Sequence, residues 1–129
     1  MRGSCLCGAV RFEVHGPLEH APEACHCAQC RRQTSHVFVG VNVRRASLVV
    51  QGERNVTWFA SSEAVRRGFC GMCGSVLFWQ PTLPGYEFTS VSMGSLDPPT
   101  GMRLAKHTFV GEKSDYYDIT DDLPQHEKF

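Results

Sequence analysis

The sequence has no long apolar run, no internal repeat and no excess of charge of either sign. No stretch approaches the ~18 apolar residues of a membrane-spanning helix, and the first residues, MRGSCLCGAV, contain no apolar signal-peptide core. Thirteen basic and thirteen acidic side chains cancel, so no overall field draws the chain to nucleic acid or to an anionic membrane. We therefore expect a soluble cytoplasmic protein that binds neither nucleic acid nor membranes.

Three common enzyme motifs are also missing. The chain contains no phosphate-binding glycine loop, no G-x-S-x-G nucleophile turn and no dinucleotide-binding fingerprint. Its 129 residues correspond to about one ordinary domain, and 42% hydrophobic residues are enough for a modest core. No low-complexity segment or domain boundary divides the chain, so we expect residues 1–129 to form a single domain.

Cysteine, by contrast, is abundant. Seven cysteines form the pattern C-x-C, then C-x-C-x-x-C, then C-x-x-C: Cys5, Cys7, Cys25, Cys27, Cys30, Cys70 and Cys73. The odd number and the reducing cytosol disfavour a disulfide scaffold, and cysteines this close rarely reach bridging geometry. Clustered thiolates favour a metal ion instead, and zinc is the natural metal because it accepts soft thiolates in a tetrahedral site.

Seven thiolates divide into four and three, although the count alone does not say which cysteines share an ion. Two hooks, Cys5-Leu6-Cys7-Gly8 and Cys70-Gly71-Met72-Cys73-Gly74, contain glycines that can take a positive φ and turn backbone N–H groups toward sulfur. Together they would form a closed structural site that joins the N-terminal strand to residues near 70. Cys25, Cys27 and Cys30 remain as a trio, and a three-ligand site leaves one position open for water or substrate.

Most of the chain between the cysteine motifs has the pattern of β-strands. Residues 9–14 alternate apolar and polar, as in a half-buried strand. β-Branched and aromatic residues indicate further strands at 37–43, 47–50, 55–60, 64–69, 75–80, 86–93 and 104–110. Residues 28–34 suit one or two helical turns, and the tail from 111 shows little periodicity. We expect a mostly-β fold with few short helices.

Six segments spread along the chain carry a recognisable set of motifs. They are GSCLCGAVRFEV, CHCAQCRRQTS, RRGFCGMCGSVLFW, VSMGSLDPP, KHTFVGEKSDYYDI and TDDLPQ. This set resembles the glutathione-dependent formaldehyde-activating enzyme family, a branch of which includes centromere protein V. The resemblance implies a zinc-stabilised β-tent domain of the Mss-like type. It also implies a carbon–sulfur lyase that joins glutathione and formaldehyde reversibly into S-hydroxymethylglutathione, or makes a related thiol adduct.

The resemblance also implies two zinc ions per chain. It assigns a structural zinc to Cys5, Cys7, Cys70 and Cys73, and a catalytic zinc with an open fourth position to Cys25, Cys27 and Cys30. This division agrees with the one drawn from the hooks. We expect the three-ligand site to lose its metal more readily and to be partly empty, and we expect glutathione to be the substrate.

A few charged and titratable side chains near the trio are further candidates. His36 lies just beyond the trio and could serve in proton transfer, whereas His26 sits between two ligands and should point away from the ion. Arg31 and Arg32 follow Cys30 directly, where guanidinium groups would suit the two carboxylates of glutathione. A solvated surface pair is the simpler interpretation of these arginines.

A function of another class stays open at this point. The chain could be a zinc-stabilised protein-binding module in which both zincs are structural and a histidine, such as His26 or His36, closes the second site. Related tent folds bind proteins, and the centromere protein V branch acts in chromosome and microtubule organisation. That branch carries extra basic sequence that this chain lacks. The sequence does not indicate an oligomeric state.

Overall fold

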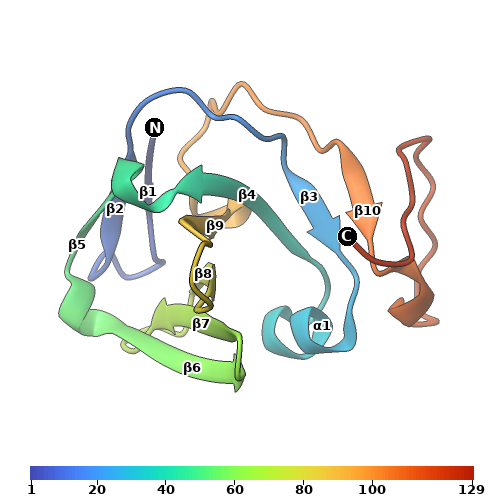
Figure 1. The fold of residues 1–129 in the computed structure, drawn as a ribbon, viewed down its shortest axis with the longest axis horizontal. Helices are drawn as coiled ribbons and strands as arrows, with labels where there is room; N and C mark the ends of the chain where they lie inside the picture. The colour runs from blue at the N-terminus through green and yellow to red at the C-terminus, as the bar shows by residue number, and fades with distance from the viewer.

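Ten β-strands and one α-helix make up the computed structural model, which describes residues 1–129 (Figure 1). The strands are β1 (Arg2–Ser4), β2 (Arg11–Val14), β3 (Glu23–Cys25), β4 (Phe38–Arg44), β5 (Leu48–Gln51), β6 (Val56–Ser62), β7 (Val65–Cys70), β8 (Val76–Pro81), β9 (Phe88–Ser92) and β10 (Lys106–Thr108). The helix, α1, spans Ala28–Thr34. The mostly-β fold with few short helices is confirmed.

The strands form two sheets. A three-stranded sheet has the order β1-β2-β5, and a seven-stranded sheet has the order β10-β3-β4-β9-β8-β7-β6. Every pairing is antiparallel except that of β10 with β3, which is parallel. In this parallel pair Thr108 lies opposite Cys25. The late strand β10 is therefore placed beside the first cysteine of the trio.

The core lies where β2 packs against strands of the larger sheet. Alternation along β2 buries Phe12 and leaves Arg11 exposed. Phe12 meets Phe78 of β8 edge to face, with ring centroids 5.5 Å apart. Val41 of β4 and Val91 of β9 belong to the same buried cluster. Burial of each such side chain contributes about 1.5–3 kcal/mol to the stability of the fold, so the packing of these side chains holds the smaller sheet against the larger one.

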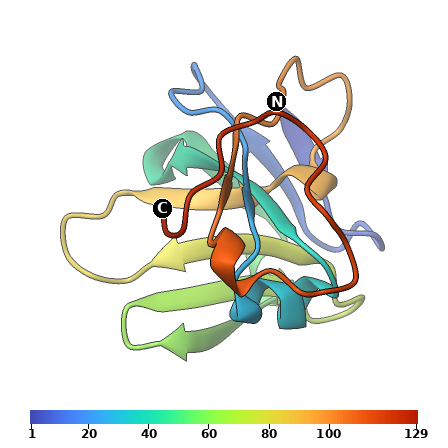
Figure 2. The ribbon, with the colours of Figure 1, turned by 90° about the vertical axis from the view of Figure 1, so that its right-hand side faces the viewer.

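The C-terminal segment runs beside β10 and extends that edge of the sheet. The backbone N–H of His107 donates to the carbonyl of Pro124 at 2.9 Å, and that of His126 donates back to His107 at 2.9 Å. The N–H of Val110 donates to the carbonyl of His126 at 3.1 Å. Figure 2 shows this segment, in red, wrapping across the face that carries β10. None of the helices has the length and apolar character needed to cross a membrane.

The structure differs from the sequence expectation at its shortest strands. β1 and β3 were not expected, since three residues are too few to show an alternating pattern. The strand expected over 104–110 is only β10, Lys106–Thr108. It ends because Phe109 takes a left-handed φ of 54°, after which a 3₁₀ turn covers Val110–Glu112.

Candidate functional site

Four cysteines from the two hooks meet at one point. Cys5 and Cys7 follow β1, Cys70 ends β7, and Cys73 lies in the turn before β8. Their four sulfur atoms all lie within 4.8 Å of one another. The Sγ atoms of Cys5 and Cys7 are 3.6 Å apart, and those of Cys7 and Cys70 are 3.8 Å apart. Sulfurs placed ~2.3 Å from a central zinc in a tetrahedron are ~3.8 Å apart, so this four-cysteine cluster fits zinc.

Backbone and side-chain donors surround these sulfurs. The N–H of Val10 donates to Cys5 Sγ at 3.2 Å, and the hydroxyl of Ser75 lies 3.2 Å from Cys73 Sγ. Hydrogen bonds from Ser75 lower the pKa of Cys73 to about 5, which favours the thiolate that a metal needs. Gly8 and Gly74 take φ values of 76° and 79°, so each hook is turned by the glycine that follows it.

The cysteine trio forms the second cluster. Cys25 is the last residue of β3, Cys27 is the N-cap of α1, and Cys30 lies in the first turn of that helix. Their sulfurs also lie within 4.8 Å of one another, and no histidine or carboxylate joins them. Hydrogen bonds from Cys25 and Cys30 lower the pKa of Cys27 well below its usual range. Three sulfur donors at these separations fit zinc with one position not supplied by the protein.

Arg67 of β7 is the cation of this cluster, and it is only 4% exposed. Its guanidinium donates to Cys30 Sγ at 3.4 Å and to the side-chain oxygens of Gln33 and Gln29, both at 3.2 Å. It also donates to Ser61 Oγ at 3.0 Å. A divalent metal on three thiolates would have a formal charge of −1, which one buried guanidinium would neutralise. Arg67 therefore ties α1 to the sheet and lies where it would balance the charge of a metal-loaded trio.

A cavity of about 630 Å³ opens directly onto the trio. The three cysteines and Arg67 form one part of its wall, and most of the remainder is hydrophobic. Strands β4, β8 and β9 and the segment around Phe109 contribute the other walls. A volume of this size lies within the ~300–1,000 Å³ typical of small-molecule sites. The trio is thus accessible to a ligand, whereas the four-cysteine cluster does not line this cavity.

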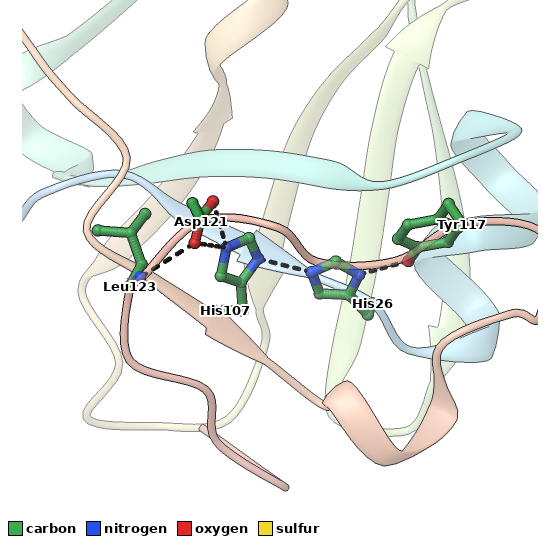
Figure 3. A network of polar contacts seen from close by, with 5 residues as sticks. All are labelled: His26, His107, Tyr117, Asp121 and Leu123. Atoms are coloured by element: carbon green, nitrogen blue, oxygen red, sulfur yellow. Dashed lines mark hydrogen bonds and ion pairs between the residues drawn. The ribbon is translucent and has the colours of Figure 1, made fainter.

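His26 does not join the sulfurs of the trio, and both of its ring nitrogens belong to a chain of polar contacts (Figure 3). Asp121 lies 3.0 Å from His107 Nε2, and His107 Nδ1 lies 2.8 Å from His26 Nε2. The other ring nitrogen of His26 meets the hydroxyl of Tyr117. The backbone N–H of Leu123 and the ring of His107 hold the pKa of Asp121 below its usual range, and burial lowers the pKa of His26.

One arrangement of protons satisfies the whole chain. An ionised Asp121 accepts from His107, whose second nitrogen accepts from His26, whose own second nitrogen accepts from Tyr117. His26 is then neutral, in agreement with its lowered pKa. No lone pair of His26 is left for a metal. His26 therefore does not close the second site, a role for which the binding-module hypothesis offered either His26 or His36.

The remaining candidates lie outside the cavity wall. His36 Nδ1 contacts the hydroxyl of Tyr116, and its ring lies 4.7 Å from that of Tyr117. Arg31 and Arg32 lie in the last turn of α1, and neither lines the cavity. Their roles in proton transfer and in binding glutathione carboxylates stay predictions.

Sequence reasoning missed Arg67 and the polar chain through His107 and Asp121. The doublet Arg66-Arg67 gave no indication, because only strand alternation separates the exposed arginine from the buried one. A strand turns one of the two arginines inward, but no local pattern shows what it will face, because Cys30 lies thirty-seven positions away. Tyr117 lay in a tail without periodicity, and nothing local linked it to His26.

Comparisons with known proteins agree with this geometry. A family model described as glutathione-dependent formaldehyde-activating enzyme matches residues 1–112. A Halomonas elongata protein, whose name assigns it provisionally to that family, is 28% identical over 127 residues, which cover 92% of this chain and 80% of that protein. An uncharacterized lyase of Schizosaccharomyces pombe is 33% identical over 82 residues, which cover 62% of this chain and 57% of that protein.

A solved structure has the same fold. The crystal structure of a Rhodobacter sphaeroides protein matches with a TM-score of 0.64 at 28% identity, covering 76% of this chain and 89% of that one. The family model extends from the first residue through β10 and the 3₁₀ turn that follows it, and so includes all seven cysteines. The chain belongs to the glutathione-dependent formaldehyde-activating enzyme family.

Proposed function

We propose that this protein is a zinc-dependent carbon–sulfur lyase that interconverts glutathione plus formaldehyde with S-hydroxymethylglutathione, or with a closely related thiol adduct. The observation that carries the proposal is the cavity of about 630 Å³ that ends on three cysteine sulfurs. A closed structural site needs no such access, whereas a site that handles substrate does. Family membership supports the choice of thiol and aldehyde.

The two clusters would hold different zinc ions. Cys5, Cys7, Cys70 and Cys73 would hold a structural zinc that staples β1 to the β7–β8 turn. Cys25, Cys27 and Cys30 would hold a second zinc, which would supply a Lewis acid that favours the thiolate form of a substrate thiol. The reducing cytosol is the compartment in which glutathione and free cysteines coexist, so we place the protein there.

In the forward direction a sulfur–carbon bond forms, the carbonyl π bond opens, and the thiol proton is transferred to the carbonyl oxygen. Three features of the chain would assist this reaction. The cavity walls hold the two reactants together, which raises their effective concentration. Arg67 keeps α1, and with it Cys30, in place. His36 stays the candidate for moving the proton.

NMR exchange spectroscopy on glutathione, formaldehyde and their adduct tests the proposal. We expect zinc-loaded protein to accelerate the exchange, and we expect Cys27→Ser to abolish this acceleration while zinc stays bound at the four-cysteine cluster. Metal analysis and circular dichroism on both proteins verify loading and folding. Full acceleration by Cys27→Ser, or none by wild type with both zincs bound, would refute the proposal.

A further inference from the structure

The cavity beside the trio has an aromatic wall. Trp79 and Phe88 stack with ring centroids 6.4 Å apart and an interplanar angle of 22°. Tyr86 packs edge-on against Phe88 at 6.1 Å. Phe109 also lines the cavity and meets Phe129 edge to face at 4.9 Å. Rings arranged in this way offer flat apolar surface to a ligand.

The charged side chains in the wall already have partners within the protein. Glu23 is paired with Lys106 at 3.1 Å, and Arg67 is engaged by Cys30 and by neighbouring polar side chains. A carboxylate oxygen of Glu112 accepts a hydrogen bond from the backbone N–H of Ala28 at 2.9 Å. The interior of the cavity therefore offers no free cation to an anionic ligand.

Neither formaldehyde nor glutathione has a large uncharged apolar group that would fill this aromatic part of the cavity. Formaldehyde has a single carbon and a single oxygen, and it leaves most of a cavity of about 630 Å³ unfilled. Glutathione carries two carboxylates and an ammonium group, and burying such charges without partners is costly. The charged ends of the peptide are better accommodated at the mouth of the cavity, in contact with water. An uncharged apolar group is what the aromatic wall is built to hold.

We propose that the carbonyl substrate of this site is an uncharged aldehyde with an aromatic or hydrocarbon substituent, which packs against Trp79 and Phe88. The inference rests on the proposed function, because the reaction is the same addition of a thiol to a carbonyl. A sulfur–carbon bond forms, the carbonyl π bond opens, and the thiol proton ends on the carbonyl oxygen. No oxidant or reductant is needed. With glutathione as the thiol, the aldehyde substituent is the part of the adduct that can fill the apolar space.

A series of aldehydes with glutathione tests the inference. The probes are formaldehyde, propanal and phenylacetaldehyde, with glyoxylate as a charged control, and each enzymatic rate is divided by the uncatalysed rate. Burying one CH₂ group of the substrate changes a binding or rate constant by about fourfold. We therefore expect the rate enhancement to be at least about tenfold higher for phenylacetaldehyde than for formaldehyde. Glyoxylate should gain nothing over formaldehyde.

Variants at Phe88 link the preference to the wall. We expect Phe88→Ala to lower the ratio of the phenylacetaldehyde and formaldehyde enhancements by about tenfold, and Phe88→Leu to restore most of it. Phe59→Ala is the matched control, because Phe59 is an aromatic side chain on β6, 60% exposed and outside the cavity. Circular dichroism verifies that each variant is folded.

The outcomes separate this inference from the proposed function. Acceleration of formaldehyde without any preference for propanal or phenylacetaldehyde would overturn the inference and leave the lyase proposal standing. A preference that appears only when an apolar thiol replaces glutathione would also overturn it. No acceleration of any aldehyde would refute the lyase proposal. Binding of 2-phenylethanol, an unreactive analogue, is then measured by saturation-transfer NMR, and binding that does not depend on Phe88 would refute the apolar site itself.

Discussion

Replacing the buried guanidinium of Arg67 should weaken metal binding at the trio without affecting the four-cysteine cluster. Arg67→Met keeps an unbranched apolar stem but removes the charge and every donor. The side chain is 4% exposed and donates to Cys30 Sγ at 3.4 Å, so water does not readily replace it. The three thiolates and their metal would then carry an unbalanced negative charge.

Two independent estimates give the size of the effect. A hydrogen bond to a charged group contributes ~1.5–3 kcal/mol. Loss of a residue that supports metal ligands costs ~10–100-fold in metal affinity, which equals about 1.4–2.8 kcal/mol. The estimates overlap, so we expect zinc affinity at the trio to fall by ~10–100-fold. Arg67→Lys keeps the charge but loses the planar fork, and its affinity should lie between those of wild type and Arg67→Met.

Competition with a chromophoric chelator measures zinc affinity. We expect the affinity of the trio to fall and that of the four-cysteine cluster to stay unchanged. Arg66→Met is the matched control: Arg66 is the neighbouring residue on β7, but it stacks on Trp58 at 4.2 Å and donates to Gln80 at 2.6 Å. If folded Arg67→Met bound zinc at the trio as tightly as wild type, charge balance by Arg67 would be the wrong explanation.

Three further perturbations test other parts of the structure. Leu123 and His107 hold the pKa of Asp121 in the folded protein below its ordinary value of 3.8. The ionised carboxylate therefore stabilises the fold fully above pH 3.8, and this stabilisation is lost as the pH falls through the lower pKa of the folded state. Urea unfolding of Asp121→Asn should therefore depend less steeply on pH below about pH 4 than that of wild type, and parallel curves would contradict this. Phe78→Ala should lower the free energy of unfolding by about 3–5 kcal/mol, because Phe78 is 2% exposed, whereas exposed Phe59→Ala should change it by less than ~0.5 kcal/mol. A strong chelator should lower the melting temperature of zinc-loaded protein, with readdition of zinc restoring it, and an unchanged melting temperature on complete metal removal would argue against a structural zinc.

The longer strands and the two cysteine hooks could be predicted because both depend on local patterns. The hairpin of β6 and β7 lies within a residue or two of its expected bounds, since alternation and turn residues mark it. The hooks are visible because close spacing alone directs two thiolates to one point. β3 could not be foreseen in this way, because its three residues form a strand only by pairing with β4 and β10.

The surroundings of the trio depend on contacts that no local pattern carries. Arg67 lies thirty-seven positions from Cys30, and Tyr117 lies ninety-one positions from His26. Such pairs are set by sheet order and by the course of the C-terminal segment, neither of which periodicity determines. Placing His26 away from the ion required only that its neighbours face inward. Naming the partners that hold it there required the three-dimensional structure.

The parallel pairing of β10 with β3 has a consequence for a chain that folds while it is being synthesised. Both hooks of the four-cysteine cluster lie within the first 73 residues, so that cluster can close once this part of the chain has left the ribosome. The trio is complete in sequence at Cys30, but its strand waits for residues 106–108 and its histidine for Tyr117. All ligands of the first site are therefore available before the segments that support the second site, residues 106–108 and Tyr117, have been made.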